Sequence, residues 1–112
     1  MKNEFLLTYS VKSDGSSQAD KDADTVRYYI DTYLSMDEDI DDVRKLDNVE
    51  TTITGAITIK SSLEIYKISD VKEFINRSVK KLIEDNNIKK SRLEIYCAVL
   101  VHGIKKPIEF QV

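Results

Sequence analysis

Hydrophobic and polar residues alternate most clearly in the stretch from Leu93 to Val101, whose odd-numbered positions are all apolar. This period of two residues is typical of a β-strand that buries one face. The even-numbered positions are polar at the start of the stretch but apolar at Ala98 and Leu100. A strand with a partly apolar second face is usually central in its sheet or covered by a partner. We therefore expect this strand to lie in the middle of a sheet.

The same alternation predicts four further strands, two of them short. Residues 3–11 are apolar at odd positions from Phe5 onward, and residues 49–60 carry an apolar face opposite a row of threonines. Residues 107–112 form a short last strand, and residues 43–46 form a short strand that turns back into residues 49–60. Gly55 interrupts its strand pattern. An isolated glycine of this kind indicates a bulge or a close backbone approach.

Two segments show the period of an amphipathic helix. Apolar residues recur at helical spacing over residues 22–35 and over residues 71–83. Residues 13–22 are rich in serine and aspartate, and we expect them to form a flexible loop before the first helix. Asp70 begins a pattern that resembles a capping box at the start of the second helix. Residues 61–68 before it are predicted to be a connector with some strand character.

This order of elements predicts a single α+β domain over residues 1–112. The plan is a ferredoxin-like two-layer sandwich in βαββαβ order, with two helices on one face of an antiparallel sheet and an extra C-terminal strand. The other sheet face would be uncovered and partly apolar, which favours a homodimer. The candidate self-interface residues are outward-facing strand residues and the last aromatic residue, namely Leu6, Thr52, Thr54, Tyr96, Leu100 and Phe110.

The composition is that of an ordinary globular protein, since 41% of the residues are hydrophobic and 33% are charged. No stretch has the pattern of a signal peptide or of a membrane span. The single cysteine, Cys97, falls on the apolar face of its predicted strand. We therefore expect a cytoplasmic protein without a membrane partner, in which Cys97 is an unreactive hydrophobic residue.

Acidic residues concentrate in the first half of the chain, most densely at residues 37–42. The first three aspartates of this run have the spacing of a calcium-binding loop. Asp42 and Asn48, however, stand where such a loop needs glycine and glutamate, so no metal is predicted. A solvated connector and an acidic surface for a basic partner are both consistent with the run. The protein-binding candidates are its acidic residues, Asp37, Glu38, Asp39, Asp41 and Asp42.

Basic residues gather in the second predicted helix and in the turn that follows it. One interpretation is a solvated helix face, in which acidic residues four positions away balance the positive charges. The other interpretation is a phosphate-binding surface for nucleic acid, although no aromatic platform accompanies it. The residues of this nucleic-acid candidate are Arg77, Lys80, Lys81, Lys89, Lys90 and Arg92.

Residue types that support catalysis are scarce in this chain. It has one histidine, one cysteine and no glycine-rich phosphate loop. His102 is the candidate general base, and Asp14 would approach it if the first and last long strands were neighbours. The sequence therefore favours a non-enzymatic protein that needs no cofactor.

The predicted layout resembles the small ferredoxin-like proteins of bacterial defence and toxin–antitoxin systems, including the CRISPR-associated small nuclease-like subunits. Such proteins place an extra strand after the last core strand and dimerise through sheet faces. The resemblance implies a nucleic-acid-binding or nuclease-like dimer as the alternative function. The chain departs from that family where an aspartate commonly closes the first strand, because Tyr9 and Ser10 stand there and the nearest acid is Asp14.

The residues themselves favour a different function from the one that this resemblance implies. The acidic run and the uncovered sheet face both suit contact with another protein rather than chemistry on a small substrate. We therefore predict a small cytoplasmic interaction protein, a regulator or inhibitor. It would act on an unidentified protein partner through the sheet face and the acidic surface.

Overall fold

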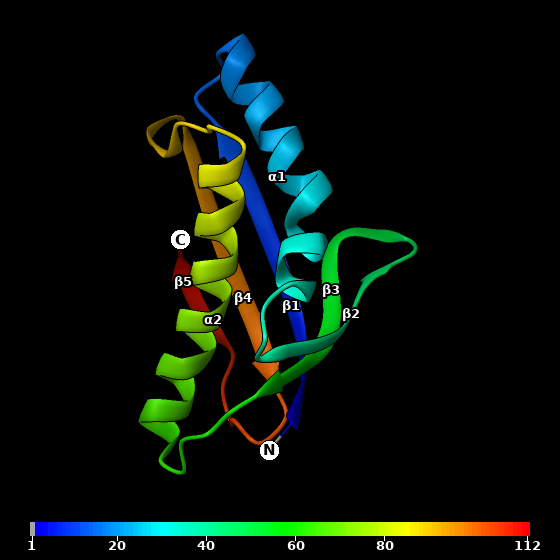
Figure 1. Ribbon diagram of the computed structural model, residues 1–112, viewed down its shortest axis with the longest axis vertical. Helices are drawn as coiled ribbons and strands as arrows, with labels where there is room; N and C mark the ends of the chain where they lie inside the picture. Colours follow the sequence, from blue (N-terminus) through cyan, green and yellow to red (C-terminus); the bar gives the residue numbers. More distant parts are fainter. Residues whose placement is uncertain (1) are drawn as a thin grey trace.

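In the computed structural model, which describes residues 2–112 apart from the side chains of residues 49 and 50, the chain forms one five-stranded antiparallel sheet and two α-helices (Figure 1). The strand order is β2-β3-β1-β4-β5, and every neighbouring pair is antiparallel. The elements are β1 (Lys2–Ser13), α1 (Ser17–Ser35), β2 (Ile40–Leu46), β3 (Val49–Thr58), α2 (Glu64–Asp85), a 3₁₀ turn (Lys90–Arg92), β4 (Leu93–Val101) and β5 (Ile108–Gln111).

The first long strand, β1, is the centre of the sheet. It pairs with β3 on one side and with β4 on the other, so that Leu7 lies opposite both Ile53 and Val99. All three side chains are fully buried. The strand beginning at Leu93, expected in the middle of the sheet, is an interior strand but not the central one, because β4 lies between β1 and β5.

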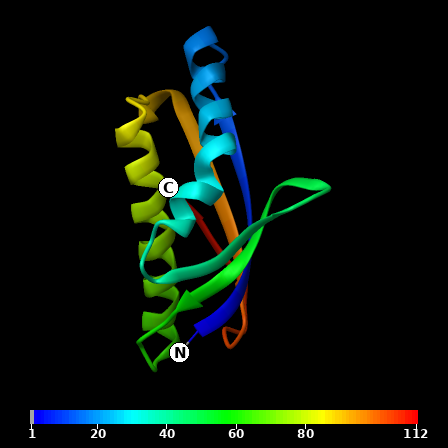
Figure 2. The same cartoon turned by 45° about the vertical axis from the view of Figure 1, so that its right-hand side comes forward.

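Both helices cover the same face of the sheet, as the two views in Figure 1 and Figure 2 agree. The odd-numbered side chains of β1 from Phe5 to Val11 point into this layer and are buried, whereas the even-numbered ones are exposed or half-buried. Val26 and Ile30 of α1, together with Val79 of α2, complete the core. The molecule is therefore a two-layer α+β sandwich with one uncovered sheet face, which we call the open face.

The first helix begins at Ser17, so residues 17–21, expected to be loop, are helical. The Ser16 hydroxyl accepts a hydrogen bond from the amide of Ala19, and the Asp14 carboxylate accepts one from the amide of Ser16 at 2.9 Å. Serine and aspartate are common in loops but are also the preferred helix N-caps. Since Ala19 and Ala23 are buried, packing against the core extends the helix into a stretch that looks like a loop by composition.

The second helix begins at Glu64, six residues before the predicted start at Asp70. The capping-box prediction was therefore wrong, and residues 64–68 are helical rather than strand-like. Within the helix, the Asp70 carboxylate accepts a hydrogen bond from the Ser61 hydroxyl at 2.8 Å. The first turn was missed because its large apolar residues, among them Ile65, face solvent and so break the expected apolar stripe.

Gly55 lies opposite Phe5 in the β1–β3 pair, and the Phe5 ring is the group that packs closely against this glycine. A Cβ atom added at Gly55 would lie 2.8 Å from Phe5 Cζ and 3.0 Å from the carbonyl oxygen of Asp41. We expect Gly55→Ala to lower the free energy of unfolding by about 1–3 kcal/mol, because the buried ring must move. Urea unfolding measures this loss. Adding Phe5→Leu should recover part of it, whereas a Gly55→Ala variant as stable as the wild type would contradict the close contact.

Candidate functional site

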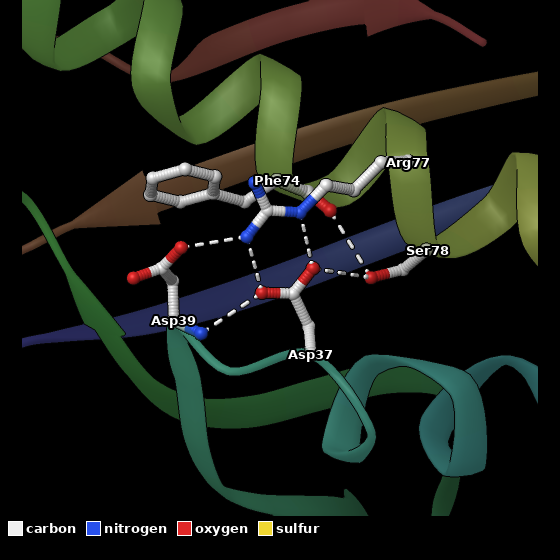
Figure 3. A network of polar contacts seen from close by, with 5 residues as sticks. All are labelled: Asp37, Asp39, Phe74, Arg77 and Ser78. Atoms are coloured by element: carbon white, nitrogen blue, oxygen red, sulfur yellow. Dashed lines mark hydrogen bonds and ion pairs between the residues drawn. The ribbon is translucent and has the colours of Figure 1, made fainter.

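An arginine of α2 holds two aspartates of the acidic run (Figure 3). Arg77 Nε donates to Asp37 Oδ2 at 2.5 Å, and Arg77 Nη2 donates to Asp37 Oδ1 and to Asp39 Oδ2, both at 2.6 Å. The guanidinium carbon also lies 4.5 Å from the centroid of the Phe74 ring. This network therefore joins α2 to the connector between α1 and β2.

Burial and charge act in opposite directions on this network. Only 6% of the Asp37 side chain and 11% of the Asp39 side chain are exposed. Burial opposes ionisation of Asp37, but the hydrogen bonds from Arg77, from the Asp39 amide and from the Ser78 hydroxyl, with the charge of Arg77, lower its pKa below the ordinary value. Hydrogen bonding to Asp37 in turn raises the pKa of Arg77. Both partners are therefore held in their charged forms.

The acidic run predicted for protein binding is thus divided by the structure. Asp37 and Asp39 turn inward to Arg77, while Glu38 and Asp42 are exposed. Asp41 is half-buried and forms an ion pair with Lys2 at 3.3 Å. The acidic surface that a partner could meet consists of Glu38, Asp41 and Asp42. Its role in binding stays a prediction.

One of the basic residues predicted to bind nucleic acid, Arg77, belongs to the same network. Arg77 was expected to face acidic residues on its own helix, but its partners lie 38 and 40 residues earlier in the chain. Four of the remaining basic residues are exposed and Arg92 is half-buried, so a basic surface persists at the end of α2 and in the following turn. Its exposed members are Lys80, Lys81, Lys89 and Lys90.

The proposed approach of Asp14 to His102 was wrong. The amide of His102 donates to the carbonyl oxygen of Glu4 near the start of β1, whereas the amide of Asp14 donates to the carbonyl oxygen of Arg92 beyond its other end. At about 3.3 Å per strand residue, the two side chains are roughly 30 Å apart. His102 therefore has no acid–base partner in Asp14.

Cys97 is buried on the core face of β4, as its place in the alternation predicted. Burial raises the pKa of its thiol to about 12, so very little thiolate forms at neutral pH. We expect the folded protein to react with a thiol-specific maleimide at pH 8 at least about 100-fold more slowly than the urea-unfolded chain. Equal rates in the two states would contradict the buried position.

The predicted self-interface residues divide between the two faces of the sheet. Leu6 lies beside Thr54 and Leu100 on the open face, where cross-strand neighbours share a side. Tyr96 and Leu100 are 40% and 53% exposed, while Thr52 has the same orientation but is buried. Four of the six candidates are therefore accessible on the open face, namely Leu6, Thr54, Tyr96 and Leu100.

Phe110 is the candidate that the structure places elsewhere. It lies opposite Cys97 in the β4–β5 pair, so its side chain shares the core face, and it packs against the core of its own chain. As a self-interface candidate, Phe110 could have been buried by another protomer, but its own chain already packs against the ring. The reason is that β5 joins the edge of the sheet beside β4, where the core is within reach.

A shallow hollow of about 460 Å³ lies on the open face, and all of its lining residues belong to β1, β4 and β5. Ala98, with one of the smallest side chains on this face, forms part of its lining between the exposed Tyr96 and Leu100. The Lys12 ammonium lies 5.8 Å from the Tyr96 ring centroid at the border of the same face. The other outward-facing residues that line the hollow are Thr8, Ser10, Glu109 and Gln111.

Within residues 2–112, no helix is both long and apolar enough to cross a membrane. No three histidine, cysteine, aspartate or glutamate side chains of this part of the chain are grouped closely enough to hold a metal ion. Compared with known proteins, the chain matches no family model, no curated protein and no solved structure. The surfaces described above are therefore the basis for a functional proposal.

The network around Arg77 had no local signal in the sequence. Its members are separated by about forty residues, and nothing in their spacing selects one arginine for two aspartates. The concentration of acidic residues in the first half of the chain and of basic residues in the second predicted helix was the one indication that acidic and basic segments would meet. The structure brings them together within a single chain.

Proposed function

We propose that this chain is a small non-enzymatic interaction protein, a regulator or inhibitor, that binds another polypeptide through the open face of its sheet. The observation that carries the proposal is the exposure of Tyr96 and Leu100 on an interior strand. A sheet face that remains in water normally carries polar residues at such positions. Contiguous exposed apolar side chains mark surfaces that another molecule covers.

We also infer a ferredoxin-like plan for the fold. The order β2-β3-β1-β4 and the two helices on one face support this assignment, with β5 added at the edge beside β4. In this plan the helical layer and the open face are opposite surfaces. The plan leaves the activity open, because one fold hosts many functions and the function depends on the surface residues.

The acidic part of the proposal rests on Glu38, Asp41 and Asp42. These residues lie at or just before β2, which forms the edge of the sheet away from β5. A basic partner could meet this edge while a polypeptide covers the open face. Asp37 and Asp39 would contribute less to such a contact, because both already pair with Arg77 and little of either side chain is exposed.

A photo-crosslinking amino acid at position 98 tests the proposal inside cells that produce the protein. We expect a crosslink to a polypeptide, because position 98 lines the hollow on the open face. The matched control carries the same amino acid at the exposed position Lys21 of α1, which should give no such product. The crosslink should disappear when Leu100→Glu is added. If position 98 yields no protein crosslink, the proposed function is wrong.

A further inference from the structure

We propose that the polypeptide on the open face is a second copy of this chain, an inference that rests on the function proposed above. The two copies would pack face to face, with a ridge of each copy in a groove of the other. The ridge is formed by Leu6 and Leu100, and the groove is formed by Thr8 and Ala98. Three features of the open face support this arrangement. They are the different side-chain sizes in its two rows, the match of these rows under a two-fold rotation, and the size of the face.

The relief follows from the register of β1 and β4. Leu6 and Leu100 are cross-strand neighbours, and Thr8 and Ala98 are the next pair along on the same face. The two rows are therefore about 7 Å apart, the rise of two strand residues. Large side chains in one row and small ones in the next produce a ridge beside a groove. The hollow of about 460 Å³ is lined by this groove row and by the row beyond it, which contains Ser10 and Tyr96.

A two-fold axis in the plane of the interface, perpendicular to the strands and midway between the two rows, makes the face complementary to itself. The rotation places the ridge of each copy over the groove of the other, so that Leu100 of one copy meets Ala98 of the other. Leu6 of one copy meets Thr8 of the other in the same way. The contact is made twice, as a symmetric dimer interface requires. Two aligned sheets of this kind pack about 10 Å apart.

The size of the face also fits a second copy. The paired length of β1 and β4 and the width of five strands give a face of about 30 Å by 24 Å, or roughly 700 Å². A standard stable interface buries about 800 Å² on each partner. The apolar centre is bordered by charged residues of both signs, but the rotation places Lys2 of each copy opposite Lys12 of the other, so the proposed contact rests on the apolar centre and not on these charges. These rim residues are Lys2, Lys12 and Arg44 together with Glu4, Asp41, Glu94 and Glu109.

Light scattering over a range of about 1 to 200 µM protein tests the dimer and its geometry. We expect the wild type to be a dimer. Ala98→Leu fills the groove and Leu100→Ala removes the ridge, and each change should raise the dimer dissociation constant at least about 30-fold. The double variant exchanges the two rows on β4 and should recover most of the affinity. Ile65→Ala, on a different exposed surface, should leave the dimer unchanged.

The outcomes separate this inference from the proposed function. A wild type that is monomeric at every concentration overturns the second copy, whereas a crosslink from position 98 to a different protein would still support the function. A dimer that Ala98→Leu strengthens, or that neither single variant weakens, overturns the ridge and groove. Circular dichroism and thermal unfolding of each variant confirm that a monomer is a folded monomer. If one of these variants is unfolded, Leu100→Glu takes its place. Leu100 is exposed, so this substitution should also give a folded monomer.

Discussion

Replacing Leu7 by alanine is expected to lower the free energy of unfolding by about 4 kcal/mol. Leu7 is fully buried in the central strand, between Ile53 of β3 and Val99 of β4. The substitution leaves a cavity where three strands and the helical layer meet, and such a site cannot collapse easily. Urea unfolding at low protein concentration, followed by circular dichroism, measures the loss.

The neighbouring residue supplies a matched control for this prediction. Leu6 is the same residue type on the other face of the same strand and is only half-buried. We expect Leu6→Ala to lower the free energy of unfolding of the monomer by less than about 1 kcal/mol. Equal losses at the two positions would contradict the assignment of the covered and open faces. At high protein concentration Leu6→Ala should show a larger loss, because it also removes part of the proposed ridge.

Removing the side chain of Arg77 is expected to lower the free energy of unfolding by about 3 kcal/mol at pH 7. Arg77→Ala leaves the carboxylates of Asp37 and Asp39 nearly buried and without their charged donor. The control, Arg77→Lys, keeps the positive charge but cannot make the two-pronged contact with Asp37. We expect the free energy of unfolding of Arg77→Lys to lie between those of the wild type and Arg77→Ala. Denaturant unfolding of the three proteins compares them directly.

The pH dependence gives a second test of the same network. The pKa of Asp37 is lower in the folded protein than in the unfolded chain. Its contribution to stability is therefore fully present above the unfolded pKa, which is about 3.9, and is lost as the pH falls through the folded value. The difference between wild type and Arg77→Ala should shrink as the pH is lowered from 7 toward about 2. A constant difference over this range would contradict the role of the ionised carboxylate.

The network also bears on what a partner can meet at the surface. Since Arg77 holds the connector that contains Asp37 and Asp39, it places the neighbouring Glu38 at the surface. In Arg77→Ala, therefore, a change in partner binding would not by itself identify a contact residue. Glu38→Gln and Asp42→Asn are better probes of the acidic edge, because neither forms part of the buried network.

Alternation and helical periodicity in the sequence were sufficient to predict the layers of this molecule. The odd positions of residues 3–11 and of the strand from Leu93 predicted the covered face, and the apolar stripe of residues 71–83 predicted the second helix. The burial of Cys97 and the exposure of Leu100 followed from the same pattern. These features depend on residues a few positions apart, and the geometry of a strand or a helix determines which of them share a side.

The tertiary structure alone decided the contacts between distant segments. Arg77 selects Asp37 and Asp39 across about forty residues, because the folding of α2 against the end of α1 brings these charges together. Phe110 is buried in its own chain because β5 pairs beside β4. Local spacing carries no information on such pairings, since many acidic and basic residues were equally available. The sequence by itself determined which faces are apolar, and packing in three dimensions decided which partners those faces and charges meet.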